Sequence, residues 1–236
     1  MYVVAVCVTG WSLPASAEER RVAVELMIAI DVSDSIDARE LAFQIDGIAS
    51  AFRDERLIQR IQSLSHGGLA VAVMFWAGKG EQRTMLDWRR VHDRASAYAF
   101  AKALSEKRAS PWSGNLFTAL GNALSHAFGE LVANRFDGDR RVIDVSSDDP
   151  HNQGIPVVAI RSRIIDEGMT INGLPILKGR VEHEDRKQLI DYYRQEVIGG
   201  FGAFMVPALS DSDYARAMLK KLILEIAGTS SLDVAG

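Results

Sequence analysis

Three oxygen-bearing side chains alternate along one short stretch of the chain: Asp31, Ser33 and Ser35. Carboxylate and hydroxyl oxygens are the ligands that hard divalent cations such as Mg²⁺ prefer. The same stretch also resembles a helix start, because Ser35 or Asp37 can accept hydrogen bonds from the first free N–H groups of a helix. Two interpretations therefore stand side by side, metal ligation and helix capping.

The neighbouring sequence predicts which elements hold this stretch in place. Residues 22–30 are aliphatic apart from Glu25, as in a strand that is covered on both faces of a parallel sheet. Apolar residues then recur at helical spacing from Leu41 to Phe52. The polar cluster therefore lies at the carboxyl end of a central strand, where open α/β sheets usually bind ligands.

The pattern D-x-S-x-S resembles the first segment of the metal-ion-dependent adhesion site of von Willebrand factor type A domains. The resemblance implies that Asp31, Ser33 and Ser35 contact a divalent cation, with Asp148 supplied by a later loop. It extends from about residue 25 to 226 and implies a doubly wound α/β fold with a mostly parallel six-stranded sheet. It also implies Mg²⁺, Ca²⁺ or Mn²⁺ as the cofactor and a protein partner that binds through the ion.

The second segment of the resemblance departs from the family pattern. A helix is expected to start at Leu116, which places Gly114 where the family has a metal-binding Thr. That ligand position is then vacant, or it is filled by Ser113, by the amide oxygen of Asn115, or by water. Mg²⁺ binds about six oxygens and readily keeps waters, so the substitution weakens the expected site without abolishing it.

Two further departures concern charge. Asp34 and Asp149 stand where the family usually has Gly. If both face the cation, up to four carboxylates surround it. Such a site would bind the metal more firmly but attract an acidic partner less, and Ca²⁺ would become a candidate as well as Mg²⁺. In the alternative interpretation, both side chains turn to solvent and cap the helices behind them.

The rest of the chain alternates strands with helices and shows no internal repeat. Strand 82–91 is more polar than its predecessor and is expected at an antiparallel edge. The expected strands are 22–30, 69–76, 82–91, 140–147, 170–176 and 203–207, and the helices after the first are 55–64, 93–104, 116–132, 156–167, 185–197 and 211–226. The pattern predicts a single domain over residues 18–228 and a disordered tail over 229–236.

Several stretches resemble an uncharacterised bacterial family of exported type A-like domains. They include Arg-Arg-Val-Ile-Asp-Val-Ser at 140–146, Ile-Asn-Gly-Leu-Pro-Ile at 171–176 and Val-Ile-Gly-Gly-Phe-Gly-Ala-Phe at 197–204. This resemblance supports the fold and implies no activity.

The first residues predict export. An apolar run is followed by Ala15-Ser16-Ala17 and then by charge, which is typical of a secretory cleavage site, so residues 1–17 are expected to be removed. Cys7, the only cysteine, would be lost with them. The expected location is periplasmic or secreted. No later stretch is apolar enough for a bilayer span, and a net charge of −4 without a long like-charge block argues against nucleic acid as a partner.

The sequence gives little support for an enzyme. Ser146, Asp148 and His151 are hydrolase residue types, but they crowd into one short loop without a nucleophile-elbow pattern. The five histidines show no zinc-binding spacing.

The expected function is therefore cation-dependent binding of a protein partner without catalysis. The alternatives are a metal-independent interaction scaffold with a degenerate site and a metal-dependent hydrolase. Trp76 and Trp112 are candidate partner contacts, with core covering as the other explanation for each.

Overall fold

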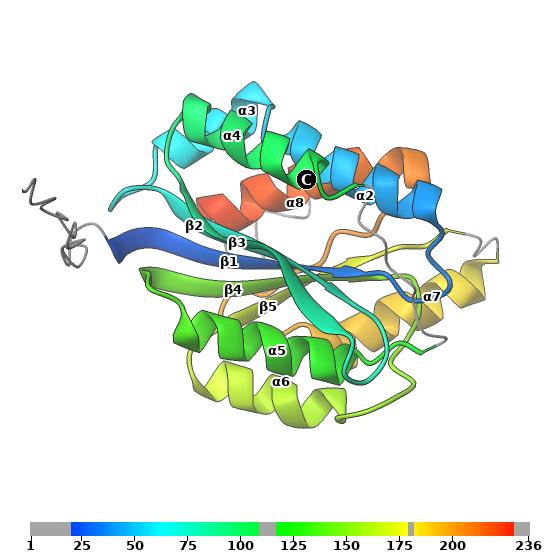
Figure 1. Ribbon diagram of the computed structural model, residues 1–236. Coiled ribbons are helices and arrows are strands. Elements are labelled where there is room, and N and C mark those ends of the chain that lie inside the picture. Colours follow the sequence, from blue (N-terminus) through cyan, green and yellow to red (C-terminus); the bar gives the residue numbers. More distant parts are fainter. Residues whose placement is uncertain (1–19, 109–116, 179–181, 229–236) are drawn as a thin grey trace, which may run out of the picture.

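A five-stranded sheet runs through the middle of the molecule in the order β3-β2-β1-β4-β5 (Figure 1). The computed structural model describes residues 20–108, 117–178 and 182–228. The strands are β1 (Arg21–Asp31), β2 (Leu69–Trp76), β3 (Gln82–Val91), β4 (Asp137–Ser147) and β5 (Thr170–Pro175). All neighbouring pairs are parallel except β2 and β3. The predicted mostly parallel sheet and its antiparallel edge strand are therefore confirmed.

Helices cover both faces of this sheet, as a doubly wound fold requires. Figure 1 shows one layer formed by α2 (Ala38–Ala51), α3 (Glu55–Gln62), α4 (Arg94–Ser105) and α8 (Asp211–Ala227). The opposite layer contains α5 (Leu120–Ala133), α6 (Val157–Asp166) and α7 (His183–Tyr192), which continues into the π-helical turn η1 (Tyr193–Val197).

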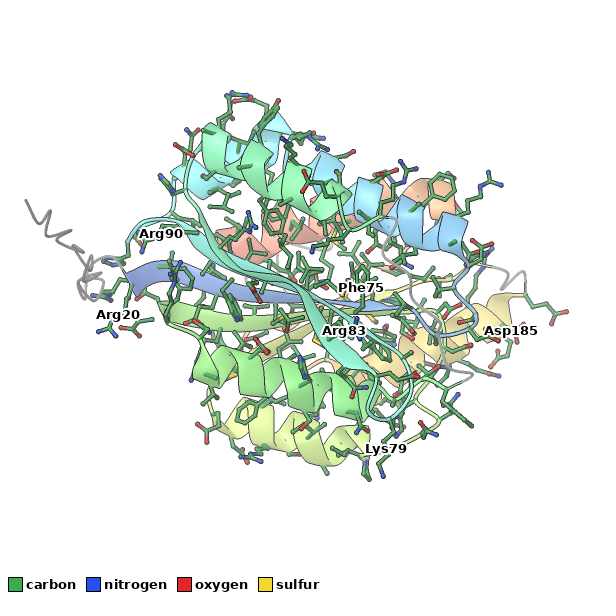
Figure 2. The ribbon with its side chains drawn as sticks, in the orientation of Figure 1. Arg20, Phe75, Lys79, Arg83, Arg90 and Asp185 are labelled. Atoms are coloured by element: carbon green, nitrogen blue, oxygen red, sulfur yellow. The ribbon has the colours of Figure 1, made fainter. Side chains whose placement is uncertain are left out.

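The core is divided between the two faces because side chains alternate along each strand. In β1, Ile28 and Ile30 pack toward α2 and α8, whereas Met27 and Ala29 pack toward α5. Phe75 of β2 belongs to the α2 and α8 side, and Figure 2 shows it inside the molecule. The same view places Lys79 at the carboxyl end of the parallel strands, away from Arg20 and Arg90.

The prediction of a sixth strand over residues 203–207 is wrong. This segment touches β5 only through isolated bridges, such as those from Gly173 to Met205 and from Ile176 to Ala208. The N–H groups of Gly173 and Leu177 donate to the carbonyls of Phe204 and Ala208, but Pro175 between them has no backbone N–H to donate, so the ladder is interrupted there. The segment instead covers the outer edge of β5.

The helix expected from Leu116 begins at Leu120 in the structure. The backbone N–H of Thr118 donates to Asn152 Oδ1 over 2.8 Å, and that of Ala119 donates to the carbonyl of Ala77 over 2.9 Å. These contacts with neighbouring loops hold the chain outside helical geometry until Leu120.

The contacts of Asn172 and Gly173 explain why this pair interrupts the otherwise apolar strand β5. A Cβ at Gly173 would lie 2.5 Å from the Tyr193 ring, so glycine lets η1 pack against the sheet. Asn172 is buried on the other face and accepts a hydrogen bond from the backbone of Phe204. Within the described residues, no helix is both long and apolar enough to cross a membrane.

Candidate metal site

Asp31 ends the central strand and lies completely buried. Its Oδ1 accepts a hydrogen bond from the backbone of Ser33 over 2.8 Å, which turns the chain back across the strand end. Its Oδ2 accepts one from the hydroxyl of Ser147, at the end of β4, over 2.6 Å. The carboxylate is therefore fixed from two neighbouring strands.

The two predicted serines continue outward from this carboxylate. The hydroxyls of Ser33 and Ser35 lie 3.2 Å apart, and Ser35 donates to Asp148 Oδ1 over 2.9 Å. Asp148 is 113 residues further along the chain than Ser35. The structure therefore brings together all four residues that were expected as principal ligands, and it forms one line of oxygens from the core to the surface.

Without a cation, the surroundings of Asp31 disfavour its ionised form. Burial, together with the nearby charge of Asp148, raises the pKa of Asp31 to about 7. The hydrogen bonds from Ser147 and Ser33 act in the opposite direction. A cation near these oxygens would favour the ionised carboxylate.

Helix capping does not account for Asp31, Ser33 and Ser35, because Asp37 is the residue that caps α2. Asp37 caps α2 and accepts hydrogen bonds from the N–H groups of Arg39 and Glu40, while the Glu40 side chain accepts from the Asp37 N–H. The capping interpretation therefore holds for Asp37, and Ser35 remains directed toward Asp148.

The two extra carboxylates do not complete a four-carboxylate site. Asp34 is exposed, whereas Asp149 is half-buried and its backbone N–H and carbonyl both contact the Ser147 hydroxyl. In the described part of the chain, no group of three or more His, Cys, Asp or Glu side chains is arranged to hold a metal ion. Any ion held here would rely on hydroxyl ligands as well as carboxylates.

The later helix start changes the candidate for the second segment. Gly114 was assigned to the Thr position only because the helix was expected at Leu116. With α5 starting at Leu120, the hydroxyl that precedes the helix belongs to Thr118, which is almost completely buried. Ser113, Gly114 and Asn115 lie outside the described residues.

The backbone around Thr118 lies between two strand ends. Its neighbour Ala119 donates to Ala77, directly after β2, and its own carbonyl accepts from Asn152 in the loop after β4. A Thr two residues before a helix start was the available sequence signal. Ser147 was also missed as a site residue, although a strand ending in Ser-Ser before Asp148 was visible.

The structure supports neither Trp76 as a partner contact nor a hydrolase triad. Trp76 is completely buried and packs against the α5 layer, so its assignment as a partner contact is wrong. Trp112 lies outside the described residues. Ser146 is buried toward Tyr214, and in the described structure no hydrogen bond joins it to His151, so the hydrolase residue types do not assemble into a triad.

The donor set fits a hard divalent cation. It contains only oxygens, from a buried carboxylate, from adjacent hydroxyls and from the half-buried carboxylate of Asp148. Such ligands suit Mg²⁺, Mn²⁺ or Ca²⁺ better than soft metals. The residues that would hold the ion are Asp31, Ser33, Ser35 and Asp148, with Thr118 at the adjoining loop.

Known structures share this fold at low sequence identity. A proximal thread matrix protein from the mussel byssus, described with a zinc-occupied metal-ion-dependent adhesion site, matches with a TM-score of 0.59 at 15% identity, covering 87% of this chain and 48% of that one. The pilus adhesin SpaC of Lactobacillus rhamnosus GG matches with a TM-score of 0.59 at 11% identity, covering 86% of this chain and 30% of that one. The von Willebrand factor domain of the pilus tip protein Mfa5 of Porphyromonas gingivalis matches with a TM-score of 0.57 at 10% identity, covering 90% of this chain and 98% of that one.

The fold is thus that of a von Willebrand factor type A-like domain, and the chain spans less than half the length of the first two proteins. The chain belongs to the family described as "Protein of unknown function (DUF1194)", which it matches over residues 21–230. No curated protein matches its sequence.

Proposed function

We propose that this domain binds a divalent cation at the end of β1 and, through it, a protein partner, without catalysing a reaction. The observation that carries the proposal is the hydrogen bond of 2.9 Å from Ser35 to Asp148. It joins two loops that are distant in sequence, above the buried carboxylate of Asp31. A bound cation would supply an open coordination position that attracts an oxygen of the partner.

Each residue has a distinct role in this proposal. Ser33 and Ser35 are neutral ligands that leave much of the ion's charge uncompensated, so that it can attract a carboxylate. Asp31 and Asp148 supply the negative charge that holds the ion. We assign to the Thr118 hydroxyl the ligand position that was expected to be vacant or filled by Ser113, Asn115 or water; its burial directly before α5 supports this assignment and a functional rather than a degenerate site.

Exposed apolar side chains suit the binding of a protein at this edge. Phe43 is 41% exposed and lines a small recess together with Asp148. Phe117 is 40% and Ile155 is 38% exposed, beside the loops that contain Thr118 and Asn152. Exposed apolar groups next to a polar centre are typical of interaction sites. The export expected from residues 1–17 would place this binding outside the cytoplasm.

A capture experiment tests the proposal. The protein is immobilised and exposed to exported proteins of the same organism, with Mg²⁺ or with chelator. We expect a partner that is retained with Mg²⁺, released by chelator and not retained by a Ser33→Ala, Ser35→Ala variant. A Thr84→Val variant, altered on β3, serves as the control and should retain it.

Two other results would contradict the proposal. Retention of the same partner in chelator and by the double variant would indicate a metal-independent scaffold. Cation-dependent hydrolysis of a chromogenic phosphate ester or carboxylic ester, lost in the double variant, would indicate a hydrolase.

A further inference from the structure

Four polar side chains lie in the core between the sheet and α8, outside the candidate metal site. They are Asp144 of β4, Asn172 of β5, and Lys221 and Glu225 of α8, each at most 3% exposed. The Nζ of Lys221 contacts both carboxyl groups. Two of the four, Asp144 and Asn172, come from the stretches at 140–146 and 171–176, and the proposed binding function uses neither.

Apolar groups surround the cluster. The Phe204 ring lies 5.6 Å from Lys221 Nζ, and the residues packed nearby on this face include Val142, Leu222 and Tyr214. Burying one amine and two carboxyl groups costs free energy, and apolar residues of similar size would often be as stable or more stable. The presence of the cluster therefore calls for a chemical explanation.

The hydrogen bonding of the two carboxyl groups is unequal. Asn172 donates to Glu225 Oε1 over 3.1 Å and holds that side chain in place. In the described structure, neither oxygen of Asp144 has a hydrogen bond of good geometry, and the contact with Lys221 satisfies the distance alone. Burial also raises the pKa of Asp144, which favours its neutral carboxylic acid form.

We propose that Lys221 and Asp144 become joined by an intramolecular amide bond, with Glu225 transferring the protons. The Nζ of Lys221 first passes a proton to the contacting carboxylate of Asp144 and then attacks the Cγ of the resulting acid, forming the C–N bond. Glu225 accepts a proton from the nitrogen and delivers it to the departing hydroxyl. One C–O bond of Asp144 breaks, one water molecule leaves, and Glu225 ends unchanged.

The surroundings fit each requirement of this step. The amine and the acid are already in contact, which removes the entropic cost of bringing them together. Glu225 contacts the same nitrogen, and burial raises its pKa to about 7, close to that of a useful proton-transfer group. A cavity of about 200 Å³ lies beside the cluster and is lined in part by Asn172, Phe204 and Glu225.

Asp144 is the acceptor rather than Glu225 for two reasons. Glu225 is held by Asn172, and it lies on the same helix as Lys221, so a bond between them would only bridge one turn of α8. A bond to Asp144 ties the last helix to a central strand. It would close a long loop of chain and stabilise the domain by restricting the unfolded state.

Mass spectrometry of the purified, folded protein tests the proposal. We expect the intact protein to be lighter than its sequence by one water molecule, and the tryptic peptide containing Asp144 to stay joined to the one containing Lys221. Lys221→Met should restore the full mass. Lys220→Met, which changes the exposed neighbouring lysine, should leave the loss of water unchanged.

Glu225→Gln tests the proton transfer separately. It preserves the shape of the side chain and should give a folded protein with the full mass, or one that loses water much more slowly than the parent. Loss of water at the parent's rate would contradict the assigned role of Glu225.

Other results would overturn the bond itself. They are a parent protein that keeps its full mass after prolonged incubation in the folded state, or water lost from a peptide that is not joined to Asp144. Because the decisive measurement uses the parent protein, a variant that fails to fold does not affect it.

Discussion

The hydroxyl of Thr118 is the single group on which the interpretation of the metal site changed. Gly114 at the expected Thr position left that ligand vacant or supplied by Ser113, Asn115 or water, whereas the helix start at Leu120 makes Thr118 the hydroxyl that directly precedes α5. Its burial, between the loops that follow β2 and β4, matches a role inside the cluster rather than at the surface.

Thr118→Val removes this hydroxyl and keeps a side chain of similar shape. We expect the dissociation constant for Mg²⁺ to rise by about tenfold or more, as seen when a group that shapes a metal site is removed. Calorimetric titration with Mg²⁺ measures this. Thr84→Val, a matched change beside His126, should leave the constant unchanged, and an equal constant for Thr118→Val would exclude this hydroxyl as a ligand.

Capping and metal ligation are also separable at the scale of single residues. Asp37→Ala removes the capping box of α2 and should lower the free energy of unfolding by about 1 kcal/mol without changing the response to Mg²⁺. Ser35→Ala should change the free energy of unfolding little in chelator but abolish the stabilisation by Mg²⁺. Urea unfolding with and without the ion distinguishes them, and loss of the Mg²⁺ response in Asp37→Ala would contradict this division.

At the scale of elements, the first turn of α5 supports the loop after β4. A Cβ added to Gly121 would lie 1.8 Å from the carbonyl oxygen of Ile155, so only glycine allows this close approach. Gly129, in the same helix, has no atom within 4 Å of its added Cβ. The two glycines therefore provide a matched pair.

Gly121→Ala should destabilise the protein by about 1 to 3 kcal/mol and weaken Mg²⁺ binding, because the loop must move away from α5. Gly129→Ala should stabilise it by up to about 1 kcal/mol through helix propensity alone. Urea unfolding and calorimetric titration measure the two effects. Equal stabilisation by both substitutions would show that the loop does not depend on Gly121.

The sequence was sufficient for the elements whose pattern is local. The apolar runs of β1 and β2, followed by turn signals, predicted the strands, and the polar residues after β1 and β4 predicted the line of oxygens. The start of α5 and the sixth strand were predicted wrongly, because hydrogen bonds to distant segments decide them. The Ala119 contact with Ala77 and the isolated bridges of residues 203–208 have no local signal.

The buried cluster around Lys221 could not be predicted from the sequence either. Asp144 and Asn172 were visible as polar residues in apolar strands, but their partners lie on α8, at the far end of the chain. Only the packing of that helix against the sheet brings them together.

At the scale of the whole molecule, Glu225 predicts how stability depends on pH. Its pKa rises from an ordinary value of 4.5 to about 7 in the folded protein, chiefly through burial. Between these values the folded state binds more protons than the unfolded state, so the free energy of unfolding should fall as pH rises. Burial acts whether or not Lys221 and Asp144 are joined, so the direction is the same in both cases.

Urea unfolding between about pH 4.5 and 7 measures this slope, to which Glu225 contributes at most about 1.4 kcal/mol per pH unit and Asp31, whose pKa is also raised to about 7, contributes in the same direction. Glu225→Gln should reduce the slope relative to the parent. At lower pH, carboxylates with lowered pKa values, such as Asp54 and Asp93, begin to be protonated and reverse the trend. Identical slopes for parent and variant would contradict the assignment to Glu225.

Thermal unfolding of the whole domain tests whether a cation binds at the end of β1. The chain from residue 18 is heated in chelator and then with Mg²⁺, Ca²⁺ or Mn²⁺, beside the Ser33→Ala, Ser35→Ala variant. A cation at about 100 times its dissociation constant stabilises by about 2.7 kcal/mol. In a domain of this size, that corresponds to an increase of about 5 to 10 °C in the midpoint. We expect this increase in the parent and its loss in the variant, whereas an unchanged midpoint with every cation at millimolar concentration would contradict cation binding at this site.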